Sequence, residues 1–425
     1  SHRWLLQSSA YKGAPRGGGP SGGATASWPC PRLSPLSLLP FTRLSLAMAA
    51  TAQTLSAADR LPVELVDCVA RLASENAWDG KAGLTLTRLC RVSKRWCHAV
   101  RTIIYGIVTI DLSPDGRFYG HNHLGLVATL DRHAHLRAFT HELRAVLTSG
   151  NTTTAGKVLD LILVLPALVE LEIECKAVQA HRLAVALEQT PNLTTLVLRC
   201  PLTPRLVNAI YRLDKLEHLE VWNEITVAPS VRPTFRLKSL MLGEPTKRRI
   251  FEDLTAASTG TLETLGICVS KGTPLDVTPF ARVQSLLLCP PEEGRYKDQD
   301  VIKCLGAIFA ASRHLPEMVQ LGLVDRVKEI RREWPFFQPR DRWLLQQLPP
   351  TLEVLDLSAA HVSFDPQNVV KYVADKARSK ALKLLFLRED EIWFEDQEEL
   401  EARLDERGIE VDWRVSRRDE QCVIT

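Results

Sequence analysis

The chain has 425 residues, of which 45% are hydrophobic and 24% are charged. These proportions are typical of a soluble globular protein that can bury a sizeable core. Its 53 basic and 50 acidic side chains leave a formal charge of +3, which excludes a strong overall attraction to nucleic acid or to an anionic membrane. The sequence has no apolar run of the roughly 18 residues that span a bilayer. Its ten cysteines form no C-x-x-C pair, so we expect an intracellular protein with reduced thiols, cytoplasmic or nuclear or both.

Residues 1–58 have the composition of a low-complexity segment. They are rich in glycine, proline and serine and bury too little apolar surface to offset the entropy of ordering them, so we expect disorder. Their five basic residues and lack of acidic ones also fit an organelle targeting segment. Three prolines between residues 31 and 40 oppose the amphipathic helix that such targeting would need. The first methionine is Met48, and a true start there would leave residues 1–47 untranslated.

A helical pattern follows from Asp59. Asp59 provides an N-cap and Pro62 a proline in the first turn, where its missing N–H costs nothing. The apolar residues of this first helix share one stripe: Leu61, Leu65, Val69 and Leu72. After a polar spacer at residues 74–84, a second helix is predicted by another apolar stripe: Leu86, Leu89, Val92, Trp96, Val100 and Ile103.

The residues of these two helices resemble the F-box family, in particular its fungal members. The resemblance covers residues 59–105 and is carried by L-P-x-E-L at 61–65, L-C-R-V-S-K-R-W at 89–96 and I-I-Y at 103–105. In that family the module binds a Skp-type adaptor, which connects it to a cullin-based ubiquitin ligase. The resemblance implies adaptor-interface or core positions at Leu61, Pro62, Leu65, Val69, Leu89, Val92 and Trp96. The spacer is longer than in most F-boxes, and a helical cap for the following domain is the alternative.

Residues 106–425 contain a degenerate repeat. Nine segments share the pattern apolar-x-x-apolar-x-apolar, and their starts lie 21 to 35 residues apart. This pattern resembles leucine-rich repeats, in which short parallel strands stack into a solenoid. The three longest spacings occur after residue 283 and imply full helices between strands. The segments start at Leu168, Leu193, Leu216, Leu237, Leu262, Val283, Met318, Leu352 and Leu382.

One departure from that family concerns its asparagine ladder. Leucine-rich repeats place Asn or Cys eight residues after the first leucine, where the side chain bonds backbone groups of adjacent turns. We therefore expect an irregular solenoid, with an ordinary α/β domain of buried parallel strands as the alternative. None of the eight corresponding residues is Asn or Cys: Lys176, Pro201, Glu224, Pro245, Ser270, Pro291, Ala360 and Asp390.

Further elements complete the predicted α/β fold. Residues 105–112 predict an introductory strand that joins the F-box to the solenoid. Helices are predicted at residues 178–189 and 301–311, and the chain is predicted to end with a helix at 396–407 and a strand at 409–415. The expected architecture is a disordered N-terminus, a helical F-box and a leucine-rich-repeat-like solenoid with parallel strands.

Alternation along the predicted strands identifies a recognition surface. In each segment the second, fourth and sixth residues after the start should point away from the core. Trp222, close to carboxylates, has the character of an interface anchor, although a packing role fits it equally well. The residues that we expect to contact a protein partner are Glu172, Arg199, Glu220, Trp222, Asp356 and Arg388.

Three patterns that suggest chemistry are weak. The stretch 150–157 resembles a phosphate-binding loop but has five residues between its glycines, Val158 in place of Ser or Thr, and a helix-like run before it. Five histidines between residues 121 and 141 fit a solvated surface better than a metal site. Cys97 beside His98 fits helix packing better than catalysis. We expect no enzymatic activity, no cofactor and no metal.

The predicted function is therefore recruitment. The chain is expected to be the substrate-recognition subunit of a Skp–cullin–F-box ubiquitin ligase. Its F-box would bind the adaptor, and through it a cullin, while residues 106–425 bind an unidentified target protein. The alternative is an interaction scaffold outside any ligase, with the helical module as a cap.

Overall fold

The structure is a computed structural model. The chain divides into residues 1–54 and 55–425, and every described residue belongs to the second part. The expectations of disorder or targeting for residues 1–58 therefore lie outside the described residues. The structure describes residues 61–75, 86, 88–113, 123–148, 152–227, 230–269, 275–289, 298–323, 326–327, 330–331, 343–358, 366–388 and 394–414.

Twelve parallel strands form one sheet in which each strand lies beside its neighbours in the chain. A short antiparallel pair, β10 (Arg326–Val327) and β11 (Ile330–Arg331), stands outside it. In sheet order the strands are β1 (Ile107–Asp111), β2 (Glu142–Leu147), β3 (Glu170–Cys175), β4 (Thr195–Arg199), β5 (His218–Val221), β6 (Ser239–Leu242), β7 (Thr264–Cys268), β8 (Ser285–Cys289), β9 (Gln320–Leu323), β12 (Val354–Asp356), β13 (Leu384–Arg388) and β14 (Glu410–Arg414).

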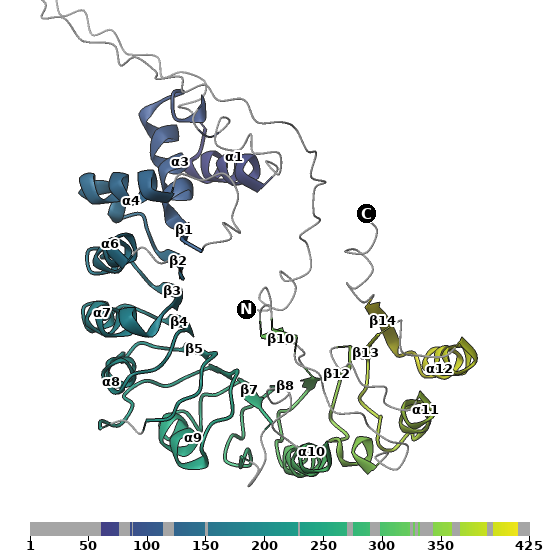
Figure 1. Cartoon of the computed structure of the whole chain (residues 1–425). Helices are drawn as coiled ribbons and strands as arrows, with labels where there is room; N and C mark the ends of the chain where they lie inside the picture. Colours follow the sequence, from purple (N-terminus) through teal and green to yellow (C-terminus); the bar gives the residue numbers. More distant parts are fainter. Residues whose placement is uncertain are drawn as a thin grey trace, which may run out of the picture. The chain divides into compact units, whose positions relative to one another are not determined.

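Helices α4 and α6 to α12 line one side of this sheet, and none of the described helices covers its other side (Figure 1). A doubly wound α/β domain would place helices on both faces. The predicted solenoid is thus confirmed and the ordinary α/β domain is excluded. The helices are α1 (Val63–Glu75), α3 (Lys94–Gly106), α4 (His123–Arg132), α5 (Ala134–Arg137), α6 (Thr152–Ile162), α7 (Ala177–Glu188), α8 (Pro204–Tyr211), α9 (Arg248–Thr255), α10 (Asp298–Ser312), α11 (Pro366–Ala374), α12 (Phe394–Arg407) and the 3-10 turn η5 (Leu345–Gln347).

All nine predicted repeat segments contain a strand, and each strand starts two residues after the segment's first apolar residue. Leu168, for example, precedes β3 by two positions and is itself buried. The predicted helices at 178–189, 301–311 and 396–407 correspond to α7, α10 and α12, and the closing strand to β14. Between Met318 and Leu352 the described residues hold β10, β11 and η5. Residues 332–342, the longest stretch of that interval in which a full helix could stand, lie outside the described part.

Strand β2 stands where a helix-like run was expected. The run before residue 150 is a strand, not a helix, and α6 begins at Thr152, so the order is strand, loop, helix. Gly156 nevertheless lies inside α6 and is buried, and a Cβ there would collide with the guanidinium group of Arg182 on α7. This glycine therefore belongs to a helix and not to the loop that a phosphate-binding motif needs.

One backbone contact recurs at the start of the strands. The carbonyl of Val169 accepts hydrogen bonds from the N–H groups of Thr194 (2.8 Å) and Thr195 (3.0 Å) in the next repeat. This shared carbonyl links successive turns without any asparagine side chain, and it satisfies backbone groups that the core would otherwise bury unpaired. The carbonyls that accept two such bonds belong to His141, Val169, Thr194, Glu217, Lys238, Glu263, Gln284, Val319 and Glu353.

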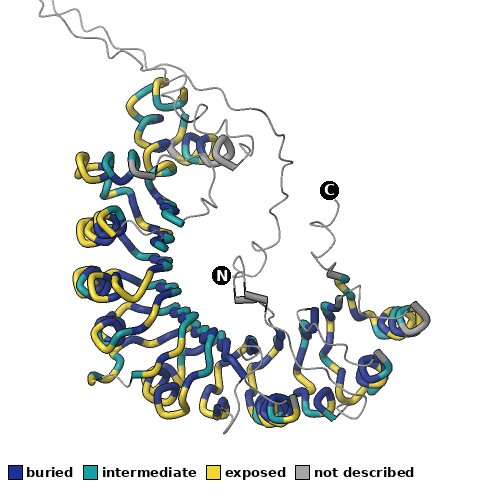
Figure 2. Tube along the Cα trace, viewed as in Figure 1, coloured by how far each residue is buried: buried dark blue, intermediate teal, exposed yellow. Residues whose placement is uncertain are grey.

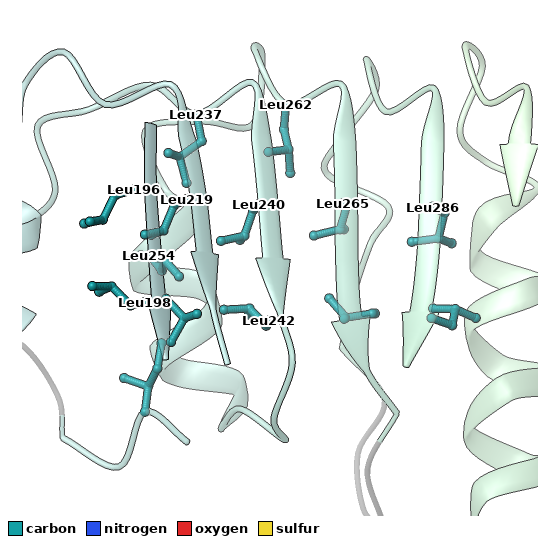
Figure 3. Close-up of a cluster of buried hydrophobic side chains, with 14 of the residues drawn as sticks. Leu196, Leu198, Leu219, Leu237, Leu240, Leu242, Leu254, Leu262, Leu265 and Leu286 are labelled. Carbon is teal, nitrogen blue, oxygen red and sulfur yellow. The ribbon is translucent and has the colours of Figure 1, made fainter. Parts of the chain in front are cut away.

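Leucines in register fill the space between sheet and helices (Figure 3). One row crosses five strands, and none of its members is more than 1% exposed. Complete burial of a leucine contributes about 1.5–3 kcal/mol, and the row repeats that contribution at each turn. Its members are Leu196, Leu219, Leu240, Leu265 and Leu286.

The helical module at residues 61–106 differs in detail from its prediction. Among the α1 residues whose burial is described, Val66 and Ala70 are buried, whereas Leu65 and Val69 of the predicted stripe are exposed. The second predicted helix is interrupted before Ser93, whose side chain caps α3 by accepting a hydrogen bond from the Trp96 N–H. Helix α3 then continues to Gly106, so the introductory strand begins at residue 107 instead of 105.

Ser258 tests the side-chain bonds that supplement the carbonyl ladder. Its buried hydroxyl accepts a hydrogen bond from the Leu237 N–H at 2.9 Å, across adjacent repeats. We expect Ser258→Ala to destabilise the protein by about 1–3 kcal/mol, because the buried N–H loses its partner. The measurement is the urea midpoint followed by circular dichroism. Ser239→Ala, on the half-buried sheet surface, is the matched control and should stay within about 0.5 kcal/mol; equal effects would contradict the prediction.

Candidate functional site: the open face of the sheet

The sheet surface that no described helix covers is called the open face. Along β3 to β6 its side chains are half-buried and alternate strictly with the buried core residues, as Figure 2 shows. Two parts differ in chemistry. The acidic section comprises Asp111, Glu142, Arg144, Glu170, Glu172, Glu174, Arg199 and Glu220, and the apolar section Trp222, Met241, Gly243, Gly266, Leu287 and Gly322.

Ion pairs cross three strands of the acidic section. Glu172 on β3 accepts from Arg199 on β4, with 2.7 Å between Oε1 and Nη1, and its other oxygen lies 3.8 Å from Nε of Arg144 on β2. Arg144 also pairs with Glu142 at 2.5 Å. The structure thus brings the predicted residues Glu172 and Arg199 into direct contact. Partly buried, interlinked pairs of this kind hold each other in place more firmly than isolated surface pairs.

Glu170 has an unusual electrostatic environment. It lies opposite Glu142 in the strand register. Burial raises the pKa of Glu170, and the negative charge of Glu142 raises it further, while Arg144 and His141 lower it. A cation placed against this pair of carboxylates would favour their ionised form.

The apolar section is built from large side chains that lie over glycines of the next strand. A Cβ at Gly243 would collide with the indole ring of Trp222, and one at Gly266 with the side chain of Met241. At Gly322 the same atom would lie 3.1 Å from Cδ2 of Leu287 on the preceding strand. Trp222 therefore packs on the sheet and stays half-exposed, and its role as an interface anchor stays a prediction.

The other predicted residues of this face lie elsewhere. Asp356 on β12 accepts hydrogen bonds from the backbone N–H and hydroxyl of Ser358. It stands seven strands from Glu172 in the sheet order, and at about 4.8 Å per strand the two residues do not share one site. Arg388 ends β13 opposite Arg414 in register, and its side chain lies outside the described part. Asp356 and Arg388 are therefore not part of the acidic section.

Sequence reasoning missed Glu142 and Arg144, which belong to the ion-pair network. The reason is that β2 was taken for a helix-like run. The alternation of polar and apolar residues in E-L-R-A-V-L at 142–147 is the signal that predicts a half-buried strand.

The residues that the F-box resemblance assigns to the adaptor fall into two groups. Leu61 and Leu89 pack against the small core of Val66, Trp96 and Ala99, in which Trp96 is buried. The other four lie at the surface of the helical module. They are Pro62, Leu65 (50% exposed), Val69 (42%) and Val92 (46%).

The remaining candidate chemistry occupies the module and the first repeat. Burial, and then the neighbouring Cys97 thiol, raise the pKa of the Cys90 thiol. His133 and His135 contact each other edge to face, with 5.8 Å between ring centroids. Within the part of the chain that the structure describes, no three His, Cys, Asp or Glu side chains gather as metal ligands would. None of the described helices is both long and apolar enough to cross a bilayer.

No known family profile matches the sequence, and no curated protein is detectably similar to it. Similar solved structures include a protein from Bacteroides fragilis, with 14% identity over 74% of both chains and a TM-score of 0.34. Another is the leucine-rich repeat-containing protein LegL7 from Legionella pneumophila, with 14% identity over 73% of this chain and 84% of that one, and a TM-score of 0.34. The repeat architecture is evident from this chain's own strand order and carbonyl ladder.

The environment of Glu170 predicts a pH effect on stability. The pKa of Glu170 is higher in the folded state than in the unfolded state. At low pH, where Glu170 is protonated in both states, the folded protein therefore loses no stability. As the pH rises through the folded-state pKa, ionisation of Glu170 lowers the free energy of unfolding. Glu170→Gln should therefore gain stability relative to wild type as the pH rises above 4.5, the ordinary pKa of a glutamate. The gain is measured as the difference between urea midpoints.

A second pair of proteins carries Arg144→Met, with and without Glu170→Gln. Arg144 lowers the pKa of Glu170, so its removal should enlarge the pH-dependent gain from Glu170→Gln. A difference between variant and wild type that does not change with pH would contradict this account.

Proposed function

We propose that the protein is a substrate receptor of a Skp–cullin–F-box ubiquitin ligase. In this proposal the helical module at residues 61–106 binds the adaptor, and the open face of the repeat array binds the target protein. The observation that carries it is the exposure of Leu65, Val69 and Val92, three apolar side chains at positions that the F-box resemblance assigns to adaptor binding. The role is binding, without catalysis by this chain.

The exposed apolar residues are concentrated in the module. Nine large hydrophobic side chains are exposed among the described residues, and four of them lie between residues 61 and 106: Leu65, Val69, Val92 and Ile104. The module has its own core, made by α1 and α3 around Trp96 and Val100, so these four side chains do not complete its packing. Exposed apolar side chains concentrated in one module favour a protein-binding role for it.

The module is joined to the array without an intervening linker. Gly106 ends α3 and residue 107 starts β1, and the Gly106 carbonyl accepts a hydrogen bond from the His141 N–H at 3.0 Å. The His98 ring packs edge to face on Phe139, with 5.2 Å between centroids. A receptor whose two ends are so connected would hold a target at a fixed distance from its ligase.

The same contacts favour a second function, an interaction scaffold in which the module only caps the array. Solenoids need a terminal unit that shields their first repeat from water, and α3 packs there. A cap, however, has no use for exposed apolar residues on its outer surface. Adaptor binding therefore decides between the two functions.

The double variant Leu65→Asp/Val69→Asp tests adaptor binding. Both side chains are exposed, so the variant should fold, whereas two desolvated carboxylates in an apolar interface should weaken binding to a purified Skp-type adaptor by at least about 100-fold. Biolayer interferometry measures the affinity, and thermal unfolding checks the fold.

The matched control is Val164→Asp/Val178→Asp, which changes two exposed valines of the array to the same residue. It should bind the adaptor as wild type does. Absence of adaptor binding by wild type, or equal affinities of all three proteins, would reject the ligase role and leave the scaffold.

A further inference from the structure

The acidic section carries an excess of negative charge at one end of the sheet. Six carboxylates face two guanidinium groups on strands β1 to β5, an excess of four. Both guanidinium groups are already engaged, Arg144 by Glu142 and Glu172 and Arg199 by Glu172. The whole chain, by contrast, has a formal charge of +3, so the acidity is a local property of this surface.

The apolar section begins where the acidic section ends. Trp222 continues β5 by one residue, as its N–H donates to the Leu198 carbonyl at 3.0 Å. It thereby lies in register between Arg199 on β4 and Gly243, the residue that follows β6. Trp222 and Met241 are both half-exposed. A partner that crosses the strands would therefore meet the carboxylates, with Val146 and Val197 among them, before it reaches the apolar section.

The spacing of the carboxylates constrains the shape of such a partner. Glu172 and Glu220 occupy the same row two strands apart, a separation of about 10 Å. A polyproline II segment has three residues per turn and repeats every ~9.3 Å, so every third side chain points to the same surface at nearly this interval. Burial next to Glu142 makes the Glu170 carboxylate costly to ionise, and a cation would relieve that cost.

We propose that the open face binds an extended basic segment of a protein partner, with Lys or Arg at every third position over the acidic section and an apolar residue against Trp222 and Met241. This inference rests on the proposed use of the open face for target binding and adds the chemistry of the target. The excess of carboxylates requires the bound segment to be positively charged, and Trp222 marks the position at which its basic part ends and its apolar residue binds.

The test uses the full chain and a fluorescent peptide of four Lys-Pro-Pro triplets followed by two leucines. Comparison peptides carry Glu in place of Lys, or Ser in place of both leucines. Fluorescence anisotropy should show the tightest binding for the Lys peptide with leucines, weakened by added salt. The positive charge of the whole chain would by itself favour the Glu peptide. Tighter binding of the Lys peptide would therefore show that the local acidic surface determines the binding.

Matched charge reversals locate the binding. Glu174→Lys/Glu220→Lys changes the acidic section, whereas Asp214→Lys/Glu317→Lys makes the same charge change at exposed turns before β5 and β9. The first variant should weaken the Lys peptide by about tenfold or more, and the second by no more than about twofold. Equal effects of the two variants, or equal affinity for the Lys and Glu peptides, would overturn the inference.

Adaptor affinity, measured on the same preparations, separates the two proposals. A wild-type protein that binds the Lys peptide through the acidic section but not the adaptor supports this inference and rejects the ligase role. One that binds the adaptor and does not discriminate between the peptides overturns this inference alone.

Discussion

The shared carbonyl at the start of the strands is the constraint on which the structure depends. Each such carbonyl accepts two N–H groups from the next turn, so it fixes both the spacing and the register of neighbouring repeats. A slip of one residue would exchange core and open faces, and the ladder prevents it. The leucine rows and the charged rows both follow from this register.

Much of the fold could be predicted because nine segments repeat the same apolar pattern. A short parallel strand in each segment buries the apolar side chains of all nine in one core. The absent asparagine ladder had little consequence, since backbone carbonyls make the link between turns. Strand β2 escaped prediction because it lies outside the repeated pattern. The buried side of α1 was misjudged because Val66 and Ala70, one position round the helix from the predicted stripe, face α3.

The candidate site was only partly accessible to sequence reasoning. Alternation placed Glu172 and Arg199 on one face, and their contact follows from the register. It could not show that Asp356 lies far along the sheet, because that distance depends on how many strands intervene. Nor could it reveal that glycines underlie Trp222 and Met241, since such contacts join residues about twenty positions apart in the chain.

Three glycines of the open face each lie beneath a large side chain of the preceding strand, and Gly322 also lies close to Asp356 of the following strand. The side chain of Trp222 packs over Gly243, that of Met241 over Gly266 and that of Leu287 over Gly322. In each case the large side chain reaches toward the strand that follows its own. Each large side chain and the glycine beneath it are expected to change together, because a methyl group at the glycine would require a smaller side chain above it. Divergence of this surface should therefore proceed by paired substitutions on neighbouring strands. Replacing one side chain–glycine pair could change the target that is bound while the other pairs keep their packing.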